Sequence, residues 1–397
     1  MAFQQGLSGL NAASRNLDVI GHNIANANTV GMKSSRAEFA ELYASSVGAS
    51  GGISQGIGVS IATVSQAFTQ GNLTITGRDM DVAINGNGFF AMSMPDGSLQ
   101  YSRDGQFKLD RDGRILNNQG GQLMGYPTDV DGNRTAFDAV GLSLPTGGPI
   151  PAQQSTAITA EFNLDTRAVV GADPVGTYGT TVLVYDQQGI AYPVAMAFEK
   201  VADNQWNVYT DAAGAGFDPL PAPAFQINFN PDGTIQPIGA QNVAVASPNG
   251  NFNVELNFDD VTQFATPFSV TNLTQDGYPP GELTSLQIED NGVIMARYSN
   301  GESQAAGQIQ LVNFRNAQGL APVGGNGWVA TFASGAPIPG APGEGNMGML
   351  KAGAVEDSNV DLTAELVNMM TAQRAYQANA QTIKTQDQVM STLLNMR

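Results

Sequence analysis

The sequence predicts an α+β protein that is mainly β, with two β-rich domains, one inserted in the other, and N- and C-terminal α-helices that pair in a coiled-coil-like inner layer. Residues 354–397 contain neither Gly nor Pro, which favours one long helix at the C-terminus. Apolar residues recur at seven-residue spacing at both ends of the chain, as in helices that pack along a narrow stripe. The residues between these ends are rich in Gly, Asn, Thr and Asp, and short strand-like runs alternate with turns.

The N-terminal segment, residues 1–30, is predicted to be an assembly helix with a narrow apolar seam. The seam consists of Phe3, Leu7, Leu10, Leu17 and Ile24. The helix is expected to end near Asn23, Asn26 and Asn28, because Asn side chains compete for backbone hydrogen bonds and favour turns.

The C-terminal segment, residues 361–397, is predicted to be the partner helix. Its seam consists of Leu362, Leu366, Met369, Tyr376, Ile383, Met390 and Leu394. A stripe this narrow suits packing against other helices better than packing on a β-domain. Isolated helices of this kind are marginal in water, so we expect both ends to gain order on assembly.

The segments next to the helices, residues 31–75 and 346–360, are predicted to be extended connectors because Gly residues alternate with β-branched ones. An inner β-domain is predicted over residues 76–145 and 276–345. Its turns are expected at Asp96-Gly97, Asp104-Gly105, Asp112-Gly113, Asn291-Gly292 and Asn300-Gly301, since Asp-Gly and Asn-Gly pairs between apolar runs are typical of hairpins.

Residues 146–275 are predicted to form an outer β-domain inserted into the inner one. Strand-like runs are found at residues 181–185, 206–209, 225–229 and 254–258. The insertion carries 12 acidic residues but only Arg167 and Lys200 as basic ones, which indicates a solvated, repulsive outer surface.

The charge and composition exclude several classes of function. The formal net charge is −18, from 35 acidic and 17 basic residues, so the chain is not expected to bind nucleic acid or an anionic membrane. The absence of Cys excludes disulfides and thiolate metal sites. No apolar run is long enough for membrane insertion, and the N-terminus lacks the basic start and apolar core of a cleaved secretory signal.

No catalytic, cofactor-binding or metal-binding residue is predicted, and the protein is not expected to be an enzyme. His22 is the single histidine, which cannot form a zinc site alone. Residues 129–133 space oxygen ligands as a calcium loop does, but they lack its third ligand and the later Glu, so a turn is favoured. The acidic pairs at residues 259–260 and 289–290 leave carboxylate acid/base chemistry open, although solvated turns are the commoner role.

Both ends of the chain carry long ordered matches to a known family. The signature residues are Asn23, Asn26, Thr29, Gly31, Lys33, Gln373, Arg374, Tyr376 and Asn379. With residues 81–90, 101–107 and 272–278, they make the chain resemble the axial proteins of the bacterial flagellum, and within them the hook proteins. The insertion, residues 146–275, resembles the family only in being a β-domain, without matching motifs. Met32 stands where the shared pattern more often has an aromatic residue.

The resemblance implies a structural subunit that self-assembles into a helical homopolymer, the curved flexible hook that acts as a universal joint and transmits torque from rod to filament. Implied partners are further copies of itself, the flagellar rod, the hook cap, the hook–filament junction proteins and the type III export apparatus. The implied location is extracellular, on the hook attached to the basal body, after export without a cleaved secretory signal. Two alternatives stay open: a distal rod protein, which shares the signature, and a secreted β-rich adhesin.

Overall fold

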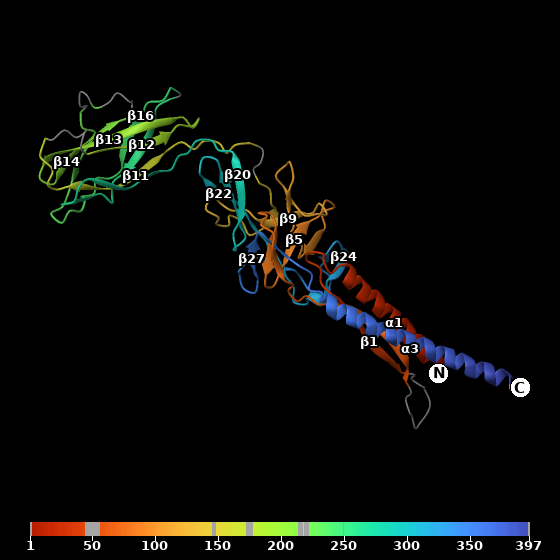
Figure 1. The fold of residues 1–397 in the computed structure, drawn as a ribbon. Coiled ribbons are helices and arrows are strands. Elements are labelled where there is room, and N and C mark those ends of the chain that lie inside the picture. The colour runs from red at the N-terminus through yellow and green to blue at the C-terminus, as the bar shows by residue number, and fades with distance from the viewer. Residues whose placement is uncertain are drawn as a thin grey trace. The chain divides into compact units, whose positions relative to one another are not determined.

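The computed structural model describes residues 2–43, 56–144, 148–171, 178–212, 217, 222–248 and 250–395. The chain divides into two compact units (Figure 1). The first contains residues 1–147, 286–296 and 304–397, and the second contains residues 148–285 and 297–303.

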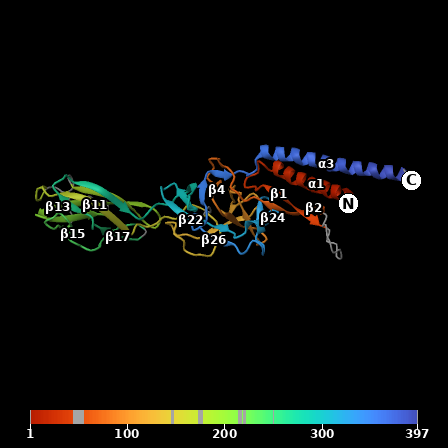
Figure 2. The same ribbon diagram turned by 90° about the horizontal axis from the view of Figure 1, so that it is seen from below.

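Two long helices in the first unit lie side by side and run in opposite directions (Figures 1 and 2). They are α1 (Ala2–Ala25) and α3 (Leu362–Asn395). Asp361 caps α3, since its carboxylate accepts hydrogen bonds from the backbone N–H groups of Thr363 and Ala364 at 2.9 and 3.1 Å. Within the described residues, neither helix is both long and apolar enough to cross a membrane.

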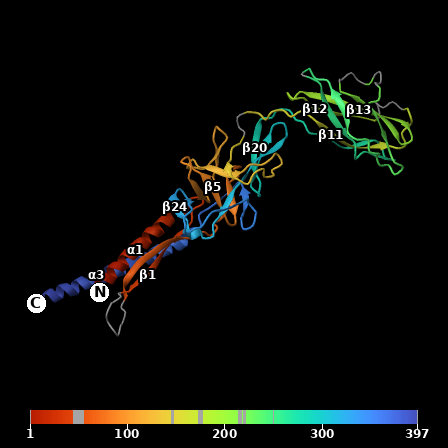
Figure 3. The same ribbon diagram turned by 180° about the vertical axis from the view of Figure 1, so that it is seen from behind.

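The segment expected to be an extended connector is extended, and it also pairs with itself. Strand β1 (Ser35–Tyr43) forms an antiparallel two-stranded sheet with β2 (Gly56–Gln66). This sheet lies along the helices, against α1 (Figures 2 and 3).

The remaining strands of the first part of the chain are short. They are β3 (Leu73–Ile75), β4 (Val82–Asn85), β5 (Phe89–Ser93), β6 (Leu99–Ser102), β7 (Lys108–Leu109), β8 (Ile115–Leu116), β9 (Gln122–Tyr126) and β10 (Val140–Gly141). The chain returns through β20 (Leu283–Ile288), β21 (Val293–Tyr298), β22 (Ser303–Ile309), β23 (Leu311–Asn313), the 3₁₀ turn η1 (Ala317–Gly319), β24 (Ala321–Gly324), β25 (Gly327–Val329), β26 (Ile338–Gly340), β27 (Met349–Ala352) and β28 (Ala354–Glu356). The main sheet runs in the order β20-β21-β22-β9-β5-β6-β25-β24, while β27 pairs with β4 and β28 with β3.

Two apolar clusters stabilise this unit. The larger surrounds Ile84, Phe90 and Leu123, all fully buried. The smaller is aromatic and contains Phe89 and Trp328, whose rings lie 5.7 Å apart at a steep angle. The N- and C-terminal halves of the inner domain therefore share their cores.

Most of the predicted turns are present. Gly97, Gly113, Gly292 and Gly301 all adopt positive φ, as Asp-Gly and Asn-Gly turns require. The prediction of a turn at Asp104-Gly105 is wrong. Gly105 lies under β4, where its carbonyl accepts a hydrogen bond from the N–H of Val82 at 2.9 Å, and a Cβ at Gly105 would collide with the Val82 carbonyl. Close backbone approach, not a turn, explains this glycine.

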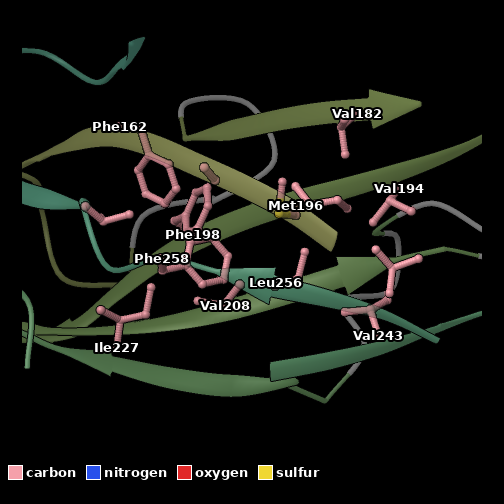
Figure 4. Packing of buried hydrophobic residues seen from close by; sticks show 14 of the residues in the cluster. Phe162, Val182, Val194, Met196, Phe198, Val208, Ile227, Val243, Leu256 and Phe258 are labelled. Atoms are coloured by element: carbon pink, nitrogen blue, oxygen red, sulfur yellow. The ribbon is translucent and has the colours of Figure 1, made fainter. Parts of the chain in front are cut away.

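The second unit is a pair of packed β-sheets. Its strands are β11 (Ala157–Asp165), β12 (Gly179–Tyr185), β13 (Ala191–Ala202), β14 (Gln205–Asp211), β15 (Phe225–Asn228), β16 (Gln241–Val245), β17 (Phe252–Asn257), β18 (Thr262–Phe264) and β19 (Ser269–Gln275). One sheet has the order β12-β13-β14-β15 and the other β16-β17-β11-β18, with β19 paired to β11. Alternate residues of both sheets point inward, and Figure 4 shows Phe162, Phe198 and Phe258 meeting between them.

Phe162 is the centre of this second core, because its ring lies 4.5 Å from that of Phe198 and 5.8 Å from that of Phe258. Phe162→Ala should lower the free energy of unfolding of the second unit by about 3–5 kcal/mol. The measurement is guanidinium unfolding of the full chain carrying Trp328→Phe, so that Trp206 alone reports on this unit. Leu183→Ala is the matched control, since that side chain is 51% exposed on β12, and it should shift stability by less than about 0.5 kcal/mol. Equal effects of the two substitutions would contradict the assigned core.

Candidate assembly surface on the terminal helices

The face of α1 that packs within the chain is lined by small residues. Gly6, Ala13 and Ile20 are buried and recur at seven-residue spacing. Gly6 lies against Ile383, because a Cβ on it would come within 3.1 Å of the Ile383 side chain. A Cβ on Gly9 would lie 2.9 Å from the Asn379 side-chain amide. Small residues thus let α1 and α3 approach closely.

The predicted seam of α1 lies beside this contact face. Phe3 and Leu7 are exposed, Phe3 by 52%, while Leu10, Leu17 and Ile24 are half-buried. Phe3, Leu10 and Leu17 each precede one of these buried positions by three residues, which places them about 60° around the helix from it. Leu7 follows Gly6 by one residue. The chain therefore leaves most of this predicted seam partly open to solvent.

The predicted seam of α3 is only partly covered within the chain. Met369 and Ile383 are half-buried on the side that faces α1, and Tyr376 lies at the margin of that side. Leu362, Leu366 and Met390 are exposed, Leu366 by 48% and Met390 by 59%. The side chain of Leu394 lies outside the described residues.

Sequence reasoning missed three exposed apolar residues on α3. They are Val367, Met370 and Val389. Val367 and Met370 each follow a seam position by one residue, so a search for a stripe broader than one residue per seven would have found them. With Leu362, Leu366 and Met390 they form two groups, one at residues 362–370 and one at residues 389–390. Together they are named the exposed α3 stripe: Leu362, Leu366, Val367, Met370, Val389 and Met390.

The helix α3 extends past the start of α1. Gly6 lies opposite Ile383, and Asn23 donates a hydrogen bond to the Glu365 carboxylate at 3.1 Å, so this antiparallel register places the start of α1 opposite about residue 386. The last turns of α3, including Val389 and Met390, consequently project beyond α1, as Figure 3 shows. They have no helical partner in the described part of the chain.

The signature residue Asn23 joins α1 to the strand that follows it. Its side chain is buried, and it both donates to the carbonyl of Ser35 at 2.8 Å and accepts from the N–H of Ser35 at 2.9 Å. Asn359 acts in the same way from the other end of the chain, since it accepts from the N–H of Ser34 and donates to the carbonyl of Ala67. These amides satisfy backbone groups that would otherwise be left unpaired at the base of the helices.

A buried ion cluster lies where the two terminal segments meet the inner domain. The Glu356 carboxylate is 2.6 Å from Lys33 Nζ and 3.0 Å from Arg103 Nη1, and all three side chains are almost fully buried. The backbone N–H of Gly71 donates to the same carboxylate at 2.9 Å. Burial, the largest influence, lowers the pKa of Lys33 and of Arg103, and the nearby Glu356 carboxylate opposes this shift.

The signature residue Gly31 belongs to the same junction. Its N–H donates to the carbonyl of Glu356 at 2.8 Å, and its φ of +72° is one that favours glycine. A Cβ there would lie 2.5 Å from the backbone nitrogen of Asp104. Upstream, Asn26 and Thr29 form the turn that ends α1, since the N–H of Thr29 donates to the carbonyl of Asn26 at 3.0 Å.

The remaining signature residues lie on α3. Gln373 and Arg374 are exposed, and Asn379 is half-buried against Gly9. The structure therefore brings together Asn23, Gly31 and Lys33 at one junction and leaves Gln373 and Arg374 on the open surface of the helix. Sequence reasoning gave no individual role to Arg103 and Asn359, which lie in segments that match the family, and it missed Glu356, whose only sequence signal is its charge.

The residues considered as candidates for catalysis or metal binding lie in turns or on the surface. The Asp129 carboxylate accepts hydrogen bonds from the backbone and the side chain of Asn133, which closes a turn around Gly132. The acidic pairs at residues 259–260 and 289–290 are exposed in turns, and His22 is exposed on α1. In the described ranges, no three His, Asp or Glu residues are grouped closely enough to hold a metal ion.

Comparison with known families shows that the chain is an axial protein of the flagellum. Four segments match flagellar families: residues 3–33 match "Flagella basal body rod protein", residues 83–161 "Flagellar hook protein FlgE/F/G D1 domain", residues 163–278 "Flagellar basal body protein FlaE D2 domain" and residues 351–396 "Flagellar basal body rod FlgEFG protein C-terminal". The chain belongs to the flagellar hook protein family. It therefore has the structural role of a hook subunit.

Full-length relatives support this assignment. The chain is 42% identical to the flagellar hook protein FlgE of Salmonella typhimurium and 43% identical to that of Escherichia coli K12, with the whole of each chain covered. It is 32% identical to FlgE of Borreliella burgdorferi, covering the whole of this chain and 99% of the relative. The crystal structure of Helicobacter pylori FlgE2 is similar in fold, with a TM-score of 0.54 and 15% identity, covering 70% of this chain and 99% of that one.

The ion cluster gives a direct test of the junction. Glu356→Gln keeps the shape of the side chain but leaves two buried cations without their counter-charge, so the free energy of unfolding of the first unit should fall by about 3–5 kcal/mol. Chemical unfolding of the full chain carrying Trp206→Phe, followed by Trp328 fluorescence, measures it. The control is Glu38→Gln, which removes the exposed Arg36–Glu38 ion pair and should cost less than about 1 kcal/mol. A loss no larger than that of the control would contradict a role for Glu356 in holding the junction.

The carboxyl group of Asp104, next to Gly105, predicts how the free energy of unfolding depends on pH. Burial raises the pKa of its carboxyl above the 3.8 of the unfolded chain, so between these two values the folded protein binds more protons than the unfolded one. The contribution of this group to the free energy of unfolding therefore falls as the pH rises through that window. Asp104→Asn removes the group, so the stability of the variant relative to the parent should increase from pH 4 upward and then level off. Unfolding curves at several pH values measure the difference, and a difference independent of pH would refute the prediction.

Proposed function

We propose that this chain polymerises with copies of itself through its terminal helices, and that the polymer is the curved tube of the hook. The observation that carries the proposal is the exposed α3 stripe, together with the exposed Phe3 and Leu7 of α1. These larger apolar residues are not covered within the chain, so they are available for contacts outside it.

Identical subunits related by a repeated rotation and rise would cover these residues in every copy. A head-to-tail contact of this kind generates a helical assembly if the rotation does not close a ring. The projecting end of α3 supports such a contact, because its apolar residues could pack only against the helices of another subunit. Residues 1–30 and 361–397 are accordingly proposed as the assembly domain, with the seam residues named above as its contacts.

A groove at the base of the helices offers a second contact for a neighbouring subunit. It has a volume of about 520 Å³ and is lined by residues of α1, α3, β1 and β2, among them Ile20, Phe39 and Asn368. Phe39 is also exposed. Because residues of both helices and of β1 and β2 line this groove, it supports a contact that extends from the helices to the connector.

The β-units are proposed to form the outer layers of the tube, with residues 76–145 and 276–345 as the inner β-domain and residues 146–275 as the outer one. The acidic excess of the outer domain suits contacts that form and break at little cost as the tube bends. Strong helix contacts and weak outer contacts together would let the tube transmit torque while it flexes, as a universal joint does.

The proposed partners are the rod, the hook cap, the hook–filament junction proteins and the type III export apparatus. The proposal is supported by the matches of both terminal segments to families described as basal body rod proteins, since shared terminal helices allow one mode of packing along the axis. The proposed location is the extracellular hook, reached without a cleaved secretory signal. We also propose that the chain is not an enzyme, since its family is structural.

Leu366→Ala tests the assembly surface. Because Leu366 is 48% exposed, its truncation should leave the melting temperature of the monomer within about 2 °C while raising the concentration needed for polymerisation several-fold. Sedimentation of polymer from the purified full chain, with electron microscopy of the pellet, measures assembly. Ile383→Ala is the matched control, since Ile383 packs on Gly6 and its loss should lower the helical signal of the monomer itself. If Leu366→Ala polymerises like the parent chain, the exposed α3 stripe is not the assembly surface.

A further inference from the structure

The turn that follows β25 holds an aromatic side chain entirely in solvent. Phe332 is 106% exposed, more than any other large apolar residue in the described part of the chain. The rings of Phe68, Phe89, Phe314 and Trp328 pack together in the same unit, and Phe332 is not among the ring pairs found within the described residues. The fold therefore gains no core packing from this side chain.

The backbone on both sides of Phe332 is nevertheless held firmly. Thr331 Oγ1 donates to the carbonyl of Gly319 at 2.5 Å, and the N–H of Thr331 donates to Ser334 Oγ at 2.9 Å. Asn316 Nδ2 donates to the carbonyl of Ala333 at 3.1 Å. Gly319 packs so closely under this turn that a Cβ on it would lie 2.4 Å from the nitrogen of Ser334.

A large apolar group on a fixed turn is well suited to bind another surface. Ordering a mobile side chain and its loop costs free energy on association, and a braced turn has already lost most of that freedom. Aromatic side chains with few rotatable bonds are also the commonest residues that dominate binding energy at protein interfaces.

The charge of the surrounding segment indicates what kind of partner fits. Residues 316–343 contain no Asp, Glu, Lys, Arg or His, although the chain as a whole has a net charge of −18. Val323 and Ile338 in this segment are exposed as well. Two copies of a strongly acidic chain repel each other over most of their surfaces, so a neutral apolar segment is where they can meet at least electrostatic cost.

We propose that the Phe332 turn is an anchor that docks on a second copy of this chain. This inference rests on the proposed polymerisation and adds a contact made by the inner β-domain to those made by the helices. The binding partner of this turn is another hook subunit. Residues 316–343 lack the charge that would attract an oppositely charged protein, and every copy of the chain presents the same neutral turn.

The first experiment compares Phe332→Ala, Phe332→Trp and the parent chain in polymerisation of the purified full-length protein. Phe332→Ala should raise the critical concentration about tenfold without changing the melting temperature, whereas Phe332→Trp should stay within about twofold of the parent. Val169→Ala is the control, since Val169 is 73% exposed in the second unit and outside the neutral segment. An unchanged critical concentration for Phe332→Ala would overturn the proposal.

The second experiment uses the absence of cysteine from the chain. Phe332→Cys labelled with a polarity-sensitive dye should show a blue-shifted emission in the polymer but not in the monomer, and labelled Val169→Cys should show no such shift. A dye at residue 332 that stays in water within the polymer would refute the docking contact.

The outcomes separate the two proposals. If the parent chain polymerises and only the helix variant Leu366→Ala is impaired, the assembly function stands and the Phe332 anchor fails. If the parent chain forms no polymer under any condition in which it stays folded, the proposed polymerisation fails and the anchor fails with it. Impairment by both Leu366→Ala and Phe332→Ala supports both.

Discussion

The buried carboxylate of Glu356 is the interaction on which the arrangement of the first unit depends. It receives Lys33 from the segment after α1, Arg103 from the inner domain and the N–H of Gly71 from the connector, while the Glu356 carbonyl accepts the N–H of Gly31. Removing such charges from water costs several kcal/mol, which is recovered only when the geometry and the hydrogen bonds are good. The cluster therefore fixes where both helices leave the domain more than it adds net stability.

The junction sets the register of α1 against α3, and this register decides which face of each helix is buried. Asn23 and Asn359 extend the cluster to the start of β1, so α1 and α3 leave the inner domain together and lie antiparallel. Gly6 and Gly9 allow the close approach of the two helices, because a Cβ on either would meet the side chain of Ile383 or Asn379. Larger apolar residues such as Leu7, Leu366 and Met370 stay exposed on this helix pair, which leaves them free for the proposed contacts between subunits.

Much of the architecture could be predicted because it depends on local patterns. The absence of Gly and Pro after residue 353 predicted α3, and Asp-Gly and Asn-Gly pairs predicted turns at Gly97, Gly113, Gly292 and Gly301. The alternation of apolar residues predicted four strands of the second unit, at β12, β14, β15 and β17. The same rule failed at Asp104-Gly105, because a glycine needed for close backbone approach has the same sequence signal as one needed for a turn.

The sequence by itself indicated the two terminal helices, several turns and strands, and the family, since these follow from periodicity, turn residues and long ordered motifs. It did not determine which face of each helix is buried, because positions such as Gly9 and Leu10 differ by one step in a repeat and only the partner helix selects between them. The pairing of β1 with β2 and the meeting of Lys33, Arg103 and Glu356 were decided by the tertiary structure alone. Lys33 and Arg103 are more than 250 residues from Glu356 in the chain, and no local pattern encodes contacts made across such a distance.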